Sequence, residues 1–376
     1  MSSPIPILLF NRALGFGGTE RQLAEVAMHL DRSRFRPHVG CIRLEGERLQ
    51  ELQASGVPLA EFYFPSFRSW RMIPAARRLG AYMRRHRIQL LHTFDGPGTM
   101  FAVPVGRMYR VPVVLSSQRA FRELKPSLSQ KWLRWTDRLV DQVVVNSANL
   151  REHLHRYEGL SPEKTTLIYN SVDLETFAPG PERHEVLPQC SVVIGSTSRL
   201  RPEKGVEDLV EAFIALAERH LQVGLLLVGE GPLLEQVRSR IQQQGLEDRC
   251  YLVGGDTQVA PWLRRMDIFV LPSLSEALSN SLLEAMAVGC SVVASAVGGN
   301  PELVREGETG LLFSPGNAVE LAEKITELVD NERLRKTLAA GGRSFVQQNF
   351  SRARSLEAMS RLYQEHLRAA GILAGR

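Results

Sequence analysis

Two glutamates, Glu276 and Glu284, stand with seven residues between them in the segment Ser-Glu-Ala-Leu-Ser-Asn-Ser-Leu-Leu-Glu-Ala-Met-Ala at 275–287. An apolar, β-branched segment that ends at Pro272 predicts a strand before them, and a helix is expected to begin near Asn280. One carboxylate then lies on a loop at the carboxyl end of a strand and the other inside the next helix. Open α/β sheets bind ligands at that edge. Carboxylates there accept hydrogen bonds from the paired hydroxyls of a polyhydroxylated ligand.

Two cations precede this pair in the same half of the chain. Arg199 and Lys204 lie in Ser-Arg-Leu-Arg-Pro-Glu-Lys-Gly at 198–205, where Arg199 follows a strand-like segment and Lys204 precedes a helix-like one. A guanidinium is a planar fork and an ammonium is a point charge, so together they suit a diphosphate. They would also stabilise negative charge that develops on a diphosphate leaving group. The alternative is that both are ordinary surface cations.

Helix N-termini and glycine turns offer further anion contacts. The helix after Ser279 presents the backbone amides of Asn280, Ser281 and Leu282 in its first turn, which suits a phosphate. Glycines in turns that follow strands permit close backbone approach to a ligand, and here they are Gly17 and Gly18 in the turn at 11–20, Gly229, and Gly254. Each turn taken alone is equally consistent with a plain tight turn.

The elements that must position these residues alternate regularly along the chain. Twelve short apolar segments, from Ile5–Phe10 to Leu311–Phe313, are separated by helix-like stretches such as Gly18–Leu30 and Val206–His220. Such alternation predicts βαβ units and parallel sheets, and 376 residues favour two domains. The segment at 177–183, with two prolines and a glycine, is the expected linker. We therefore expect domains at about 1–176 and 184–350, and a helical tail at about 351–376.

Charge is distributed unevenly between the two halves. Residues 1–180 hold 25 Lys+Arg and 16 Asp+Glu, a net +9, whereas the remainder holds 21 and 25, a net −4. Seven arginines and no acid lie in 68–87, and eight basic residues lie in 107–138, both with interleaved tryptophans. This pattern indicates an anionic membrane surface or a phosphorylated substrate, with a solvated helix face as the alternative. No nucleic-acid-binding motif accompanies the charge, so nucleic acid is not an expected partner.

The cysteines and the N-terminal segment give no sign of a metal centre or of export. The four cysteines lie far apart, without metal or redox spacing. The apolar segment at 5–10 is too short for a membrane span and has no basic residues before it, so a secretory signal is not expected. We therefore expect a cytoplasmic protein, with a peripheral position on the inner face of the cytoplasmic membrane as the alternative.

Several motifs together resemble glycosyltransferase family 4, the group 1 glycosyltransferases. They are, in order, Gly17-Gly-Thr-Glu20, Tyr169-Asn-Ser-Val-Asp173, Arg199 with Glu203-Lys204-Gly205, Val228-Gly-Glu-Gly-Pro232, Leu271-Pro-Ser273, Glu276 with Glu284-Ala-Met-Ala287, and Gly298-Gly-Asn-Pro-Glu302. The resemblance covers nearly the whole chain. It implies the GT-B fold, in which two Rossmann-like domains face one another across a cleft and the C-terminal helix returns to the first domain.

The resemblance also implies roles for individual residues. Arg199 and Lys204 would hold the diphosphate, Glu276 would contact the donor sugar and Glu284 the ribose. The amides of 280–282 would meet the diphosphate, and Gly17 and Gly18 would line the site near the phosphates. The family retains anomeric configuration and usually needs no metal and no cofactor, in keeping with the lack of an Asp-x-Asp tripeptide.

The chain departs from the family after the strand expected at Val111–Ser116. Many relatives carry a histidine there, whereas this chain has Gln118 and Arg119. Arg119 could hold an acceptor phosphate or the donor sugar, and Gln118 could hydrogen-bond the sugar. His92 and Asp95, after another strand of the first domain, are acceptor-side candidates, although a histidine at a strand end is more often structural.

These observations predict a retaining, metal-independent hexosyltransferase. It would move a sugar from a nucleoside diphosphate sugar, UDP favoured over GDP, to a hydroxyl of a saccharide or lipid-linked saccharide in polysaccharide or glycolipid biosynthesis. No carboxylate nucleophile is evident in the first domain, which favours a same-face mechanism. Two alternatives stay open: a nucleotide-sugar epimerase or phosphorylase on the same fold, and an inactive donor-binding accessory subunit.

Overall fold

The chain forms two compact units in a computed structural model that describes residues 3–15, 17–124 and 127–373. The first unit, hereafter unit 1, comprises Met1–Asn170 and Ala353–Arg376, and unit 2 comprises Ser171–Arg352. The chain thus leaves unit 1 six residues earlier than the sequence predicted. The predicted tail includes residues 374–376, which lie outside the described residues.

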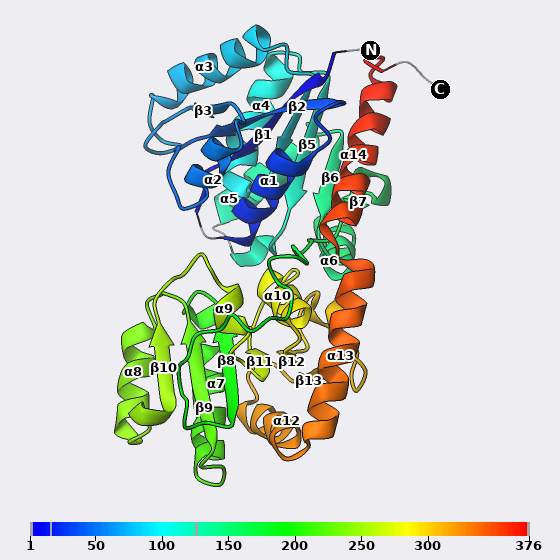
Figure 1. Ribbon diagram of the computed structural model, residues 1–376. Helices are drawn as coiled ribbons and strands as arrows, with labels where there is room; N and C mark the ends of the chain where they lie inside the picture. The colour runs from blue at the N-terminus through cyan, green and yellow to red at the C-terminus, as the bar shows by residue number, and fades with distance from the viewer. Residues whose placement is uncertain (1–2, 16, 125–126, 374–376) are drawn as a thin grey trace. The chain divides into compact units, whose positions relative to one another are not determined.

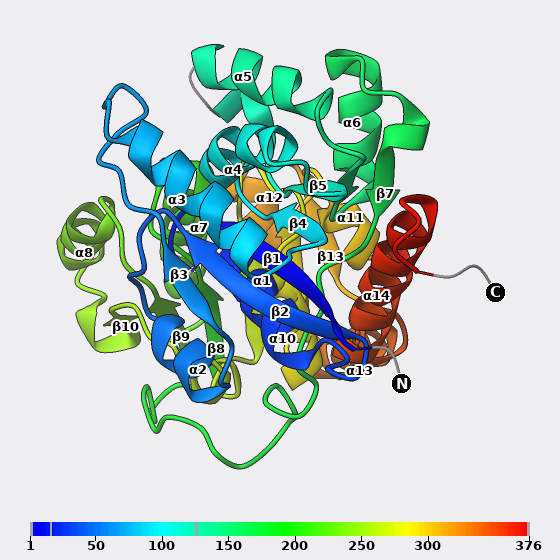
Figure 2. The same cartoon turned by 90° about the horizontal axis from the view of Figure 1, so that it is seen from above.

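Unit 1 is a parallel sheet flanked by helices (Figures 1 and 2). Its strands run side by side in the order β3-β2-β1-β4-β5-β6-β7, all parallel where they pair. Its elements are β1 (Ile5–Asn11), α1 (Gly18–His29), β2 (Phe35–Cys41), α2 (Leu49–Ala54), β3 (Leu59–Glu61), α3 (Met72–Arg85), β4 (Leu90–Thr93), α4 (Gly96–Met108), β5 (Val113–Gln118), α5 (Ser127–Asp137), β6 (Gln142–Val145), α6 (Ala148–Glu158), β7 (Thr165–Leu167) and α14 (Arg352–Ala369).

Alternation along β1 divides the core of unit 1 into two layers. Ile7 and Leu9 of β1 belong to a cluster that includes buried residues of α1 and α14. Phe10, which points to the other face, contacts Phe101 of α4, with ring centroids 5.9 Å apart and ring planes tilted by 45°. Both faces are therefore covered, as is typical of parallel sheets, and the last helix of the chain forms part of the core.

Unit 2 has the same layered construction (Figure 1). Its sheet has the order β10-β9-β8-β11-β12-β13, again parallel throughout. Its elements are β8 (Val192–Thr197), α7 (Val206–Ala217), β9 (Val223–Val228), α8 (Leu234–Gln243), β10 (Cys250–Val253), α9 (Ala260–Leu263), β11 (Ile268–Leu271), α10 (Asn280–Val288), β12 (Ser291–Ser295), α11 (Asn300–Leu303), β13 (Leu311–Phe313), α12 (Ala318–Asp330) and α13 (Glu332–Asn349).

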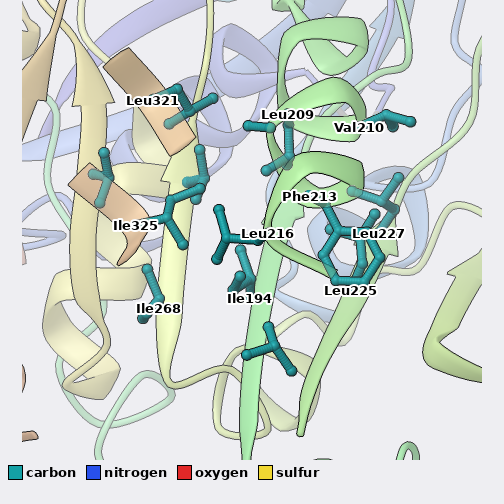
Figure 3. Close-up of a cluster of buried hydrophobic side chains, with 14 of the residues drawn as sticks. Ile194, Leu209, Val210, Phe213, Leu216, Leu225, Leu227, Ile268, Leu321 and Ile325 are labelled. Atoms are coloured by element: carbon teal, nitrogen blue, oxygen red, sulfur yellow. The ribbon is translucent and has the colours of Figure 1, made fainter. Parts of the chain in front are cut away.

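Branched and aromatic side chains fill one face of this second sheet. Figure 3 shows Phe213 and Leu216 of α7 directed at Leu225 and Ile194 of the strands beneath, and all four are buried. Burying one such side chain contributes roughly 1.5–3 kcal/mol. The layer fixes α7 against the sheet, and thereby fixes the loop between β8 and α7.

Both sheets reverse strand order at one point. Numbered within its own unit, each sheet begins 3-2-1-4-5-6, so the first strand lies next to the fourth. Loops that follow these two strands diverge to opposite sides and leave a crevice that binds ligands in open α/β sheets. The expected positions are the loops after β1 and β4 in unit 1, and those after β8 and β11 in unit 2.

Most predicted elements are present, with shifted ends. The strand expected at Val111–Ser116 is β5 at Val113–Gln118, and the one expected at His38–Leu44 is β2 at Phe35–Cys41. Pro37 is tolerated inside β2 because β3 pairs with this strand only from Val39 onward, so the missing N–H has no partner to lose. The three-residue strand β3 was not predicted.

Candidate functional site

An ion pair spans the reversal point of unit 2. Lys204, after β8, contacts Oε1 of Glu276, after β11. Ser273 donates a hydrogen bond to the same oxygen over 3.0 Å. The side chains of Lys204 and Glu276 are 27% and 12% exposed, so both keep a face open at the carboxyl edge of the sheet. The structure thus brings two of the predicted site residues together.

Backbone geometry holds the two loops in contact. The amide of Leu274 donates to the carbonyl of Glu203 over 2.9 Å. Gly205 has φ +62°, and a Cβ there would lie 2.1 Å from the carbonyl oxygen of Pro272. A side chain at 205 would therefore push the loops apart, and only glycine permits this approach. The sequence Glu-Lys-Gly fixes where the ammonium of Lys204 stands.

Arg199 and the neighbouring glycine turns lie at the same edge. Arg199 is exposed, two residues beyond β8. Gly229, directly after β9, has φ +152°, and a Cβ there would lie 1.8 Å from the carbonyl oxygen of Ser198. Gly254 follows β10, and a Cβ there would lie 3.6 Å from its nearest neighbour, Oε1 of Glu230. Three adjacent strands thus end in turns at this edge, where Gly229 packs against the Ser198 backbone and Gly254 is exposed.

The N-terminus of α10 is capped by its own serine. The Ser279 hydroxyl accepts a hydrogen bond from the amide of Leu282 over 3.2 Å and lies 3.0 Å from the hydroxyl oxygen of Ser281. The Leu282 amide, expected to bind phosphate, is instead used by the cap, because an N-cap side chain accepts from N2 or N3. The other two predicted amides, of Asn280 and Ser281, belong to the same first turn.

Glu284 lies inside α10 and is only 4% exposed. Glu284 is therefore not an ordinary exposed helix residue. It lies four positions after Asn280, so both occupy the same face of the helix. This carboxylate lies one turn beyond the amides that were predicted to bind the diphosphate.

In unit 1, the predicted acceptor-side carboxylate has a structural role. Asp95 is the N-cap of α4: Oδ1 accepts from the Gly98 amide over 2.8 Å. Oδ2 accepts from the Arg12 amide over 3.2 Å, which joins the loop after β1 to the loop after β4. Gly17 is the N-cap of α1 and Gly18 its first residue, at the same edge. The carboxylate of Asp95 therefore orients the reversal point of this sheet.

His92 does not present its ring to a ligand, contrary to the acceptor-side prediction. It is fully buried, with Nδ1 2.7 Å from the Tyr363 hydroxyl and Nε2 2.9 Å from the Ser117 hydroxyl. Burial lowers the pKa of His92 well below its ordinary value, so the ring is neutral at physiological pH. The histidine ties α14 to β4 and β5.

Gln118 is likewise engaged within the protein, which argues against the predicted contact with sugar. Its amide nitrogen donates to the Ala120 carbonyl, and its oxygen accepts from Nε of Arg122 over 3.3 Å. Gln118 is the last residue of β5 and is 6% exposed. Arg119 comes directly after the strand: Nη1 donates to Oδ1 of Asn170 over 2.6 Å.

Three contributors were not predicted from the sequence as site residues: Ser273, Asn170 and Tyr363. The first two stand within motifs that carried the family resemblance, Leu-Pro-Ser and Tyr-Asn-Ser-Val-Asp, so their positions held a usable signal. Tyr363 gave none, because it stands 271 residues from the histidine that it contacts.

Within 3–15, 17–124 and 127–373, no group of three or more His, Cys, Asp or Glu side chains is placed to hold a metal ion. Over the same ranges, no helix has the length and apolar character needed to span a bilayer.

Family models match both halves of the chain. The model described as Glycosyltransferase Family 4 matches residues 16–176, and the model described as Glycosyl transferases group 1 matches 183–345. The chain belongs to the group 1 glycosyltransferases of family 4. Residues of the Lys204–Glu276 pair fall within the second match, and Asp95 and Arg119 fall within the first.

Individual relatives and solved structures agree with this assignment. The glycosyltransferase is 28% identical over 249 residues to the lipopolysaccharide core biosynthesis mannosyltransferase LpsB of Rhizobium meliloti, a match that covers 63% of this chain and 69% of LpsB. It is 28% identical over 197 residues to an N-acetylgalactosamine-N,N'-diacetylbacillosaminyl-diphospho-undecaprenol 4-alpha-N-acetylgalactosaminyltransferase of Campylobacter jejuni, with 52% of this chain and 53% of that protein matched.

The HepE protein of Anabaena, solved in complex with UDP, is similar in structure with a TM-score of 0.84. The match has 22% identity and covers 96% of this chain and all of that one. A sucrose-phosphate synthase of Thermosynechococcus elongatus gives 0.81 and 22%, with 97% and 100% covered. These neighbours confirm the GT-B fold that the sequence predicted, with two parallel sheets and alternating helices.

Proposed function

We propose that this glycosyltransferase moves a sugar from a nucleoside diphosphate sugar, with retention of anomeric configuration, to a hydroxyl of a saccharide or lipid-linked saccharide. The observation that carries the proposal is the Lys204–Glu276 pair at the reversal point of unit 2. It sets a cation for the diphosphate beside a carboxylate for sugar hydroxyls. Glu284 stands on the Asn280 face of α10, which suits a ribose.

In this mechanism, cationic side chains of the protein stabilise the negative charge on the diphosphate leaving group. As the bond between the anomeric carbon and the diphosphate oxygen breaks, Lys204 and Arg199 stabilise the developing negative charge. The departing phosphate takes the proton of the acceptor hydroxyl, and the new bond forms on the same face of the sugar. Asp95 supports this route, because hydrogen bonds from two amides make its carboxylate a poor nucleophile. Trapping a covalent glycosyl-enzyme adduct would refute it.

With cations supplied by the chain, we propose that transfer needs no divalent metal. Activity that survives exhaustive treatment with EDTA supports this, and activity restored only by Mg²⁺ or Mn²⁺ contradicts it.

A UDP-sugar is our preferred donor, because structures of HepE were solved with UDP and with UDP-glucose. The test is a thermal-shift screen of the full chain against UDP, GDP and ADP and their sugars, in which a ligand raises the apparent melting temperature by mass action. Stabilisation by UDP alone among the three nucleotides supports the proposal. Stabilisation by none of them contradicts it.

Product analysis separates the alternatives that use the same fold. Incubation with the donor that binds, with and without acceptor, distinguishes transfer from epimerisation and phosphorolysis. An accessory subunit would bind the donor without consuming it in a single-turnover reaction.

We further propose that an anionic membrane surface presents the acceptor to unit 1. The name of the Campylobacter relative includes a saccharide linked to diphospho-undecaprenol. Trp70 and Ile73, at and just after the start of the arginine-rich segment, are 74% and 56% exposed. Leu128 and Trp135 of α5 are 73% and 46% exposed. Exposed aromatic and aliphatic groups beside arginines suit the lipid interface.

Flotation with liposomes of graded anionic content tests this surface. We expect binding that rises with anionic lipid, falls with salt, and weakens in Trp70→Ala. The control is Leu221→Ala, which removes an equally exposed side chain (77%) from unit 2. Binding that ignores lipid charge, or that both variants weaken equally, contradicts the proposal.

A further inference from the structure

Arg119 is a partly enclosed cation without a counter-charge. Its guanidinium lies 5.4 Å from the centre of the Phe94 ring, and Nη1 is bonded to the neutral amide of Asn170. Nε is buried and has no hydrogen-bond partner among the described residues. No carboxylate pairs with Arg119 in the described part of the chain. This arrangement leaves a positive charge uncompensated at the carboxyl edge of the first sheet.

A second buried arginine, three residues later, shows how the same chain treats a structural cation. Arg122 is 2% exposed and forms two parallel bonds to Asp137, of 2.7 and 2.9 Å. It also contacts Oε2 of Glu158 at 2.8 Å. A buried guanidinium that only supports the fold is thus neutralised twice here. Arg119 lacks this compensation, although the two residues stand in one loop.

The surroundings of Arg119 disfavour its positive charge, but the guanidinium stays protonated. Burial lowers the pKa of Arg119 to about 10, which leaves the group charged at neutral pH. The neighbouring His92 is neutral and cannot serve as a counter-ion. An uncompensated, partly desolvated cation is costly, and one that binds an anion is stabilised by it.

We infer that Arg119, steadied by Asn170 and Phe94, is an anion-binding subsite for a carboxylate or phosphate group carried by the substrate that enters unit 1. The inference rests on the proposed function only in that the anion belongs to a transferred sugar or to an acceptor. A guanidinium binds either anion through two parallel hydrogen bonds. A neutral glutamine would keep hydrogen bonding but lose the attraction.

Binding of small anions to the full-length protein tests the inference. The donor site is first saturated with the nucleotide found in the thermal screen. Melting temperature is then measured with sodium phosphate, sodium glucuronate and glucose, at ionic strength matched with sodium chloride. The variants are Arg119→Gln and Arg119→Lys. The control is Arg77→Gln, which removes the same charge from an exposed position of unit 1.

Phosphate or glucuronate should raise the melting temperature of the wild type and of Arg77→Gln, whereas glucose should not. In Arg119→Gln, most or all of this increase should disappear. Arg119→Lys should keep part of it. A response to phosphate alone identifies a phosphorylated substrate, and a response to glucuronate alone identifies a uronic acid. An equal rise in Arg119→Gln, or no rise in the wild type, overturns the inference. Nucleotide stabilisation that persists in that case leaves the proposed function intact.

Discussion

Replacing Lys204 by methionine should nearly abolish turnover and leave the fold almost unchanged. The magnitude follows from exposure. With side chains 27% and 12% exposed, Lys204 and Glu276 form an ion pair near the surface, and such pairs contribute about 1 kcal/mol or less. Loss of one group that stabilises transition-state charge costs roughly 10²–10³-fold in kcat, about 2.7–4 kcal/mol. The effect on the transition state therefore exceeds the effect on folding severalfold.

The assay compares donor consumption in a single turnover with thermal unfolding of the same preparations. For Lys204→Met we expect at least a 100-fold slower reaction and a melting temperature within about 2–4 °C of the wild type. Lys336→Met is the matched control, since Lys336 pairs with Glu332 on an exposed face of α13, with side chains 75% and 64% exposed. Rates of Lys204→Met close to those of the wild type, or a collapse of its melting temperature, would refute the argument.

Three further predictions concern stability and the turns. Arg122→Gln should lose about 3–5 kcal/mol of unfolding free energy in urea titrations, because buried Asp137 loses its cation and Glu158 keeps only the exposed Arg134 at 3.4 Å, whereas Arg119→Gln should lose almost none. Similar losses in both would show that Arg119 is compensated after all. Burial lowers the pKa of His38 from 6.5 to about 4. As the pH falls below 6.5, His38 is protonated in the unfolded chain but stays neutral in the folded one. Its protonation therefore lowers the free energy of unfolding by about 3 kcal/mol at pH 4. Unfolding of the wild type and of His38→Gln across pH 7 to 4 measures it, and parallel curves would contradict the assignment. Gly229→Ala should weaken nucleotide binding at least tenfold in calorimetric titrations, because its Cβ would collide with the Ser198 carbonyl; unchanged affinity would show that the turn can adapt.

The sequence was informative about the architecture because α/β patterning is local. A strand such as β11 is a run of buried apolar residues, and α10 begins at a serine cap, so both could be placed from neighbouring residues. The alternation of such strands and helices along the chain predicted parallel sheets. Strand ends shifted by two or three residues, since pairing with a neighbouring strand decides where a strand stops.

Side-chain roles were predictable where one loop sequence fixes them. Lys204 and Glu276 were expected at one edge and do meet there. His92 could not be resolved, because its burial depends on Tyr363 from the far end of the chain. Asp95 was likewise ambiguous, since a carboxylate after a strand serves equally as a ligand or as a helix cap.

The return of α14 to the first sheet has a consequence for the order in which the protein is made. Unit 2 is one continuous stretch of chain, so it can complete its core while residues beyond 352 are still within the ribosome. Unit 1 cannot, because Met359, Leu362 and Tyr363 belong to the same core as β1. Strand β1 therefore waits for α14, which is synthesised much later. A chain that stops at about residue 350 would contain a folded unit 2, but the core of unit 1 would lack α14 and its apolar residues would be exposed. Such a product would be a target for degradation.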